Sequence, residues 1–202
     1  GAGTYSDGKL TTRINDPLCE TVLRLLHQNG APDEILRLAK PHIGTDLLKG
    51  VVSAMRRQIE RQGGTVHFWT PLTGLVVRQG QLEAVLADGQ PLACERAVLA
   101  IGHSARDTFQ MLYESGIALQ PKPFSVGVRI EHAQQAIDRA LYGRLAGHAA
   151  LPPAEYALSH REGGRACYSF CMCPGGAVVA AASEAGGVVT NGMSCHARNG
   201  PN

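Results

Sequence analysis

The chain has 202 residues, of which 44% are hydrophobic, and its formal net charge of +2 comes from 19 basic and 17 acidic side chains. This length suits one or two domains, and the hydrophobic fraction is sufficient for a folded core. The charges are spread along the sequence, which argues against a nucleic-acid partner, and no segment approaches the roughly 20 apolar residues that a membrane span requires. Six cysteines without a recognisable secretory signal predict reduced thiols and a cytoplasmic location.

A long helix is predicted over residues 45–62. Apolar residues recur there at spacings of three and four, which gives one hydrophobic face. Thr45 is the expected N-cap, and Gly63-Gly64 is the expected stop. A short strand is predicted directly afterwards, over residues 65–68.

Three further strands and two tight turns follow. Gln79-Gly80-Gln81 and Asp88-Gly89 are typical of hairpin turns, so the strands are expected to form an antiparallel meander. The predicted strands span residues 72–77, 82–86 and 92–94.

Residues 97–101 form an unbroken apolar run that ends at Gly102. Such a run is typical of a strand buried on both faces. Ligands bind at the carboxyl ends of strands in open α/β sheets, and glycine there permits a close approach of backbone to ligand.

The second half predicts mainly antiparallel structure. Two prolines in residues 120–123 disfavour both helix and central strand, so we place a domain boundary there. Phe124 to His132 alternates apolar and polar residues like a strand. The other expected elements are helices over 105–115 and 133–141 and strands over 156–159, 166–170, 178–182 and 188–190.

The order helix, glycine pair, strand, meander and strand resembles the middle of an FAD-binding domain of the glutathione-reductase type. Six segments narrow the resemblance to the uncharacterised bacterial and plastid FAD-dependent dehydrogenase-like proteins. These segments are residues 1–13, 40–46, 99–109, 123–132, 167–176 and 186–194.

This resemblance implies an α/β fold with two parts. Residues 1–119 would form an incomplete FAD/NAD(P)-binding, Rossmann-like domain with a β-meander, and residues 120–202 a mainly antiparallel α+β domain on the substrate side. The sequence contains neither the family's glycine-rich G-x-G-x-x-G turn nor its C-terminal flavin segment, so we expect an internal fragment. Such a fragment is expected to bind FAD weakly and to be inactive alone.

The resemblance also places several residues near FAD, each beside a purely structural interpretation. Residues 6–9 could equally form an ordinary surface turn. In the same way, Ser104 could serve as a helix N-cap and His103 as a structural hydrogen-bonding group. Asn191-Gly192 is equally a hairpin turn. The candidate cofactor-binding residues are Ser6, Asp7, Gly8, Lys9, Leu72, Gly102, His103, Ser104, Asn191, Gly192 and Met193.

Three cysteines form a C-x₃-C-x-C pattern at Cys167, Cys171 and Cys173. On an extended strand they would share one face, which suits either redox thiols or soft metal ligands. Only Cys195 and His196 offer a fourth ligand, and buried cysteines acting as small hydrophobic groups are the favoured interpretation. We therefore expect no metal, and Cys171 and Cys173 are the weak candidates for a catalytic role.

Arg129 lies on the predicted strand at 124–132, and His132 lies at its end. These two residues could bind an anionic substrate, but a solvated strand face and a strand terminus explain them equally well.

By resemblance, the whole protein is an FAD-dependent oxidoreductase that transfers electrons or a hydride, with NAD(P)H as a candidate donor. The alternatives are a non-catalytic flavin-binding scaffold and a thiol or metal-binding module. The sequence leaves the substrate and the oligomeric state open.

Overall fold

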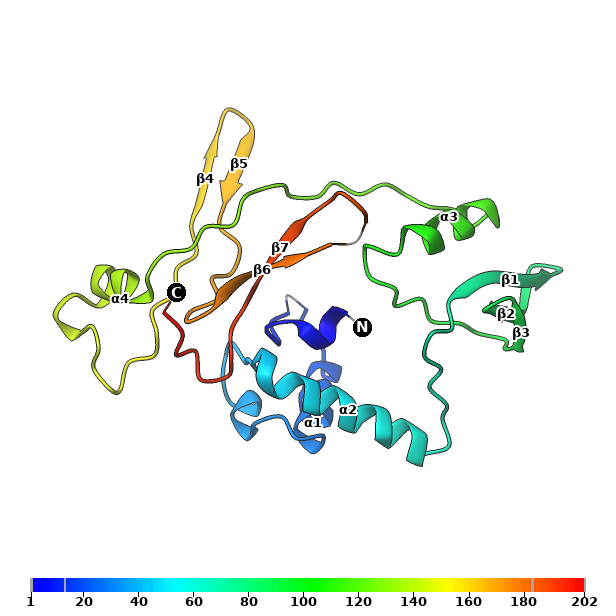
Figure 1. Cartoon of the computed structure of the whole chain (residues 1–202), viewed down its shortest axis with the longest axis horizontal. Coiled ribbons are helices and arrows are strands. Elements are labelled where there is room, and N and C mark those ends of the chain that lie inside the picture. The colour runs from blue at the N-terminus through cyan, green and yellow to red at the C-terminus, as the bar shows by residue number, and fades with distance from the viewer. Residues whose placement is uncertain (1, 13, 183, 202) are drawn as a thin grey trace. The chain divides into compact units, whose positions relative to one another are not determined.

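The computed structural model describes residues 2–12, 14–182 and 184–201, with side chains from Thr4 onward. It is a mixed α/β structure that divides into two compact units (Figure 1). Unit 1 contains residues 1–64 and 128–202, and unit 2 contains residues 65–127. The limits of these units do not coincide with the predicted boundary after residue 119. The division into domains 1–119 and 120–202 stays a prediction.

Two helices and two short 3-10 turns form the first part of unit 1. The helices are α1 (Leu18–Gln28) and α2 (Thr45–Arg61), and the turns are η1 (Ala2–Tyr5) and η2 (Asp33–Leu36). The predicted helix at 45–62 is confirmed. Its N-cap is Gly44, however, because the Thr45 hydroxyl donates to the carbonyl of Ser6 at 3.0 Å and leaves the helix end uncapped.

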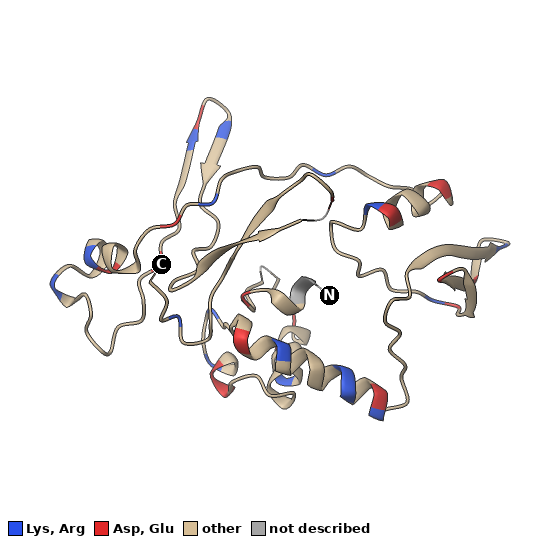
Figure 2. Ribbon diagram, viewed as in Figure 1, with Lys and Arg blue, Asp and Glu red and all other residues tan. Residues whose placement is uncertain are grey.

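The core of unit 1 lies between these elements. Burial of apolar side chains is the main favourable term in folding, and the buried residues here come from η2, from α2, from the chain that joins them and from the chain just before η2. The buried members are Ala31, Ile35, Ile43, Leu48 and Val51, and α1 adds Leu23 and Leu26 at its edge. Acidic and basic residues are interspersed along α2, as Figure 2 shows.

The C-terminal part of unit 1 contains one helix and two separate hairpins. The helix is α4 (Gln134–Tyr142), followed by the turn η3 (Gly143–Leu145). The hairpins are β4 (Ser159–Glu162) with β5 (Arg165–Tyr168), and β6 (Ala177–Ala181) with β7 (Val189–Met193). The predicted helix at 133–141 is confirmed, and the predicted strands at 166–170, 178–182 and 188–190 overlap β5, β6 and β7. The predicted strand at 156–159 shares only Ser159 with β4, and the strands form two separate two-stranded sheets rather than one.

Unit 2 contains the predicted meander and one helix. Strands β1 (Leu72–Arg78), β2 (Gln81–Ala87) and β3 (Gln90–Ala93) pair antiparallel in chain order, and α3 spans Arg106–Glu114. Both tight turns have positive φ at two successive residues, 51° and 78° at Gln79-Gly80 and 51° and 77° at Asp88-Gly89. This is the backbone of a type I′ turn, which explains why the glycine pattern located the hairpins correctly.

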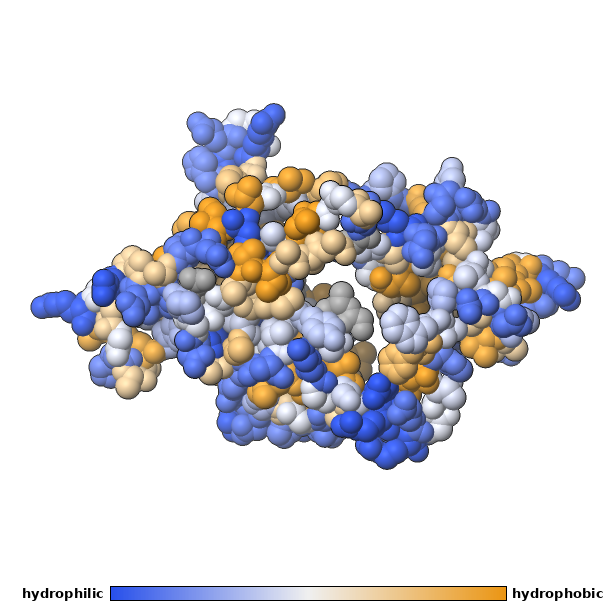
Figure 3. Space-filling view, viewed as in Figure 1, coloured by the Kyte–Doolittle hydropathy of each residue, from blue (hydrophilic) through white to orange (hydrophobic). Residues whose placement is uncertain are grey.

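Three predicted strands are absent from the structure. Residues 65–68, 97–101 and 124–132 are extended or irregular chain without ladder partners among the described residues. Most of their apolar side chains are exposed to solvent, with exposed fractions of 93% at Val98 and 86% at Phe124. Figure 3 shows hydrophobic areas open on the drawn face.

The physical reason is that an apolar run forms a strand only where neighbouring strands take its backbone hydrogen bonds. Every strand pair of the described residues is antiparallel. The structure is therefore mixed α/β with small antiparallel sheets, and the Rossmann-like parallel sheet stays a prediction. Among the described residues, no helix is long and apolar enough to cross a membrane.

Candidate functional site

A buried carboxylate organises a polar cluster in unit 1. Asp7 Oδ1 accepts hydrogen bonds from the backbone N–H of Ser194 at 2.8 Å and from the Ser194 hydroxyl. The same oxygen lies 3.2 Å from Nε2 of His42, which must carry its proton there because a carboxylate only accepts. All three residues are buried, so the alternative of an ordinary surface turn is wrong for Asp7.

Lys9 and Cys173 form the second half of this cluster. Lys9 Nζ lies 3.3 Å from Asp7 Oδ2, donates to the Met172 carbonyl, and lies 3.2 Å from Cys173 Sγ. The thiol points in turn toward Asp7 Oδ2 at 3.9 Å. We call Asp7, Lys9, His42, Cys173 and Ser194 the Asp7 cluster.

The charges in the Asp7 cluster are set by burial and by these contacts. Burial raises the pKa of Asp7, but hydrogen bonds from His42 and Ser194 and the charge of Lys9 outweigh it, so its pKa lies well below 3.8. Burial lowers the pKa of Lys9, but Cys173 and Asp7 raise it to a greater extent, so the amine is a cation at neutral pH. Burial and Asp7 together raise the pKa of the Cys173 thiol above 9.0, against the effect of Lys9, and keep it protonated.

Serine, histidine and aspartate meet in the Asp7 cluster, but not as a nucleophilic triad. A triad needs one histidine nitrogen on the serine and the other on the carboxylate. Here Nε2 of His42 faces both, at 3.3 Å from Ser194 Oγ and 3.2 Å from Asp7 Oδ1. The Ser194 hydroxyl is buried against the carboxylate itself, so these three groups join chain segments rather than attack a substrate.

Backbone contacts hold three distant segments in place around Asp7. Lys9 and His42 form an isolated antiparallel bridge, and Ile43 N donates to the Gly8 carbonyl at 3.1 Å. At the start of α2, Thr45 N donates to the Ser194 carbonyl at 3.0 Å. Residues 6–9, 42–46 and 192–196 thus converge, although the first and last are far apart in sequence.

Of the predicted cofactor residues, those at the two ends of the chain converge. Gly192 lies beside Cys173, whose sulfur would be 3.1 Å from a Cβ at that position. Asn191, Gly192 and Met193 lie in strand β7, with Asn191 opposite Val179, so the alternative of an Asn-Gly hairpin turn is wrong. Gly8 N donates to the Ser6 hydroxyl at 3.2 Å, so these two residues do form a local turn.

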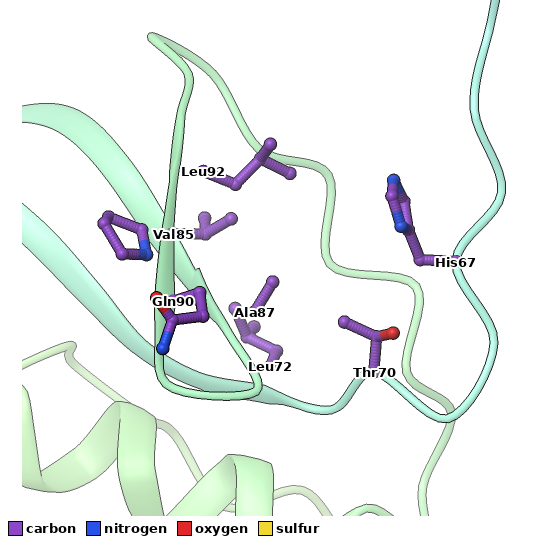
Figure 4. Close-up of a pocket in the computed structure, with 8 residues that line it drawn as sticks. His67, Thr70, Leu72, Val85, Ala87, Gln90 and Leu92 are labelled. Atoms are coloured by element: carbon purple, nitrogen blue, oxygen red, sulfur yellow. The ribbon is translucent and has the colours of Figure 1, made fainter.

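The other predicted cofactor residues lie in unit 2. Leu72 lines a pocket of about 410 Å³ together with Val85, Ala87 and Leu92 of the meander. Figure 4 shows these apolar side chains on the meander and His67 and Thr70 on the chain that precedes it. The pocket is mainly apolar, and the role of Leu72 in cofactor binding stays a prediction.

The turn after the predicted strand at 97–101 has free space around Gly102. Gly102 has φ of 70° and no atom near its absent side chain, so the glycine suits both the backbone shape and a close approach of ligand. Ser104 Oγ lies 2.7 Å from Nδ1 of His103, and the N-cap of α3 is Ala105, so the N-cap alternative for Ser104 is wrong. The cofactor role of Gly102, His103 and Ser104 stays a prediction.

The three cysteines do not lie on one extended strand, the arrangement in which they would share a face. Cys167 lies in β5, which ends at Tyr168, whereas Cys171 and Cys173 lie in the irregular chain beyond it. Within the described part of the chain, no three histidine, cysteine, aspartate or glutamate side chains are placed to hold a metal ion. The nearby N–H groups of Gly175 and Gly176 donate to Gln134 Oε1 and the Cys173 carbonyl, so they serve the fold.

His42 is the member of the Asp7 cluster that sequence reasoning did not single out. It lies inside the segment at residues 40–46, but neither spacing nor periodicity connects it to Asp7. A buried hydrogen-bond network between distant segments has no local sequence signal.

Similarity to known proteins relates the second half of the chain to flavoproteins. Residues 123–202 match the family described as FAD-dependent protein, C-terminal domain-like. An uncharacterized protein of Clostridium beijerinckii is 51% identical over 201 residues, which cover 98% of this chain and 38% of the relative. The chain therefore spans about 38% of the length of the curated relative that it matches.

Proposed function

We propose that this chain is part of an FAD-dependent oxidoreductase and that the Asp7 cluster lies at its flavin site. One observation carries the proposal: residues 6–9 and 191–193 both lie close to Cys173, through Lys9 and Gly192. Both segments were expected near the flavin, and Cys173 lies within the residues that match the FAD-dependent family. A cytoplasmic location is part of the proposal and is supported by the six free cysteines.

The positive charge of the cluster suits an anionic cofactor. Lys9 is a cation held in a half-buried position, and Gly192 brings its strand directly against Cys173. These two residues would contact the cofactor, while Asp7, His42 and Ser194 would fix the backbone that presents them. FAD, when bound, would supply the electron or hydride transfer, and reduced NAD(P)H is the proposed donor. Leu72 and Gly102–Ser104 are proposed as further cofactor contacts.

The full-length Clostridium beijerinckii relative offers a direct test. The purified protein is expected to carry FAD with visible absorbance, and anaerobic addition of NADH or NADPH is expected to bleach it. A relative that takes up no flavin would refute the proposal. Flavin that dithionite reduces but no nicotinamide donor reduces would identify a scaffold and refute the dehydrogenase activity.

The isolated chain is expected to bind FAD at least about 100-fold more weakly than the relative. The sequence contains no G-x-G-x-x-G turn, and the loss of two charge-assisted hydrogen bonds to a diphosphate costs about 3 kcal/mol. Fluorescence titration of FAD with each protein measures the two dissociation constants. Equal affinities would show that the phosphate-binding turn is not needed.

A further inference from the structure

A basic side chain beside the Asp7 cluster lacks an acidic partner. Arg129 lies in the extended chain that precedes α4, and its Nη2 donates to the Thr190 carbonyl at 3.4 Å. Among the described residues, no carboxylate lies within ion-pair distance of its guanidinium group. No carboxylate in the described part of the chain therefore neutralises the charge of Arg129.

Gly192 brings this arginine close to the thiol of Cys173. Arg129 Nη1 and Cys173 Sγ each lie 3.1 Å from the point that a Cβ on residue 192 would occupy. Any larger residue would press on both groups, so the glycine is what allows them to share this place. Lys9 Nζ contacts the same sulfur at 3.2 Å, so two cationic groups approach one thiol.

The balance of charge around the sulfur is positive. Lys9 is partly neutralised by Asp7 at 3.3 Å, and Asp7 also accepts from Ser194 and faces His42. Burial keeps the Cys173 thiol protonated, so the sulfur adds no negative charge. The charge of Arg129 is left over, and a guanidinium group presents paired donors that match a carboxylate.

We propose that Arg129 and Lys9, which both lie close to the Cys173 thiol and Gly192, bind the carboxylate group of a small-molecule ligand. The identification of that ligand as the substrate rests on the proposed flavoenzyme function. The anion site itself depends only on this chain.

Two alkylating reagents of similar size but different charge test the site on the chain without flavin. Iodoacetate carries a carboxylate and iodoacetamide is neutral, and mass spectrometry of peptides measures the labelling rate of each cysteine. An unneutralised positive charge a few Å away is expected to raise the iodoacetate-to-iodoacetamide rate ratio at Cys173 about fivefold above that at the exposed Cys167 and Cys195. The ratio cancels the slower overall reaction of a protonated thiol.

Variants connect the preference to the named residues. Arg129→Gln is expected to bring the Cys173 ratio down to that of Cys167, since it removes the charge from an exposed side chain with one weak hydrogen bond. Arg144→Gln, at an exposed arginine of η3, is the matched control and is expected to leave the ratio unchanged. A ratio at Cys173 no higher than at Cys167 and Cys195, a ratio unaffected by Arg129→Gln, or a thiol that neither reagent reaches would each overturn the proposal.

Competition identifies the chemical class of the anion. Malonate is expected to slow the labelling of Cys173 by iodoacetate more than sodium chloride at equal ionic strength, which controls for screening. Equal slowing by the two salts would overturn the carboxylate site. Stronger protection by inorganic phosphate than by malonate would also overturn it and indicate a phosphate group instead. Because no flavin is present, these outcomes are independent of whether the full-length relative binds FAD.

Discussion

Replacing Asp7 by asparagine is expected to lower the free energy of unfolding of the chain by about 3 to 5 kcal/mol, the range for removing one partner of a buried charged pair. The amide would present an N–H₂ group toward donors and would leave Lys9 without its carboxylate. Urea unfolding followed by far-UV circular dichroism measures the loss. This signal reports on unit 1, because α1 and α2 account for 11 and 17 helical residues, whereas the single tryptophan, Trp69, lies in unit 2.

The control for this change is Asp33→Asn in the same unit. Asp33 pairs with Arg37 at 3.0 Å on the surface, where such a pair contributes about 1 kcal/mol or less. A similar loss from both variants would contradict the structural role of the Asp7 cluster.

The same carboxylate makes the stability of the chain depend on pH. Its pKa in the folded chain lies below its ordinary value of 3.8, so Asp7 stabilises the fold fully above that value. This stabilisation is lost as the pH falls below 3.8 toward the folded-state pKa. Asp7→Asn is expected to show a smaller loss of stability on acidification than the unaltered chain, and parallel pH curves for the two would exclude this explanation.

The second large effect is expected from Gly44→Ala, at the junction between the Asp7 cluster and helix α2. Gly44 has φ of 93°, and a Cβ there would lie 2.2 Å from the backbone nitrogen of His196. Both strain and a backbone clash oppose the substitution, so we expect a loss of about 4 kcal/mol or more in the same urea experiment.

The matched substitution is Gly50→Ala inside helix α2. Its Cβ would meet no atom within 4 Å, and alanine is favoured over glycine in a helix by about 1 kcal/mol, so this variant is expected to gain stability. A loss from Gly50→Ala as large as that from Gly44→Ala would show that any substitution near α2 is disruptive and would remove the argument for a specific contact with His196.

Local signals predicted the local elements of this chain well. The hydrophobic face over 45–61 specifies a helix, and the glycines after Gln79 and Asp88 specify two hairpin turns, because the preferences of a few adjacent residues decide such elements. The same reasoning was wrong for residues 97–101 and 124–132, since a strand also requires a partner that the segment itself does not encode.

The candidate site depends both on local features of the sequence and on the tertiary structure. The polar turn at residues 6–9 and the cysteines at 171 and 173 can be found in the sequence, because their residue types and spacing are local features. Only the tertiary structure places Lys9 against Cys173 and buries Asp7 between His42 and Ser194. These contacts join residues more than 30 positions apart, and their energy comes from satisfying one buried carboxylate, which no periodicity or composition records.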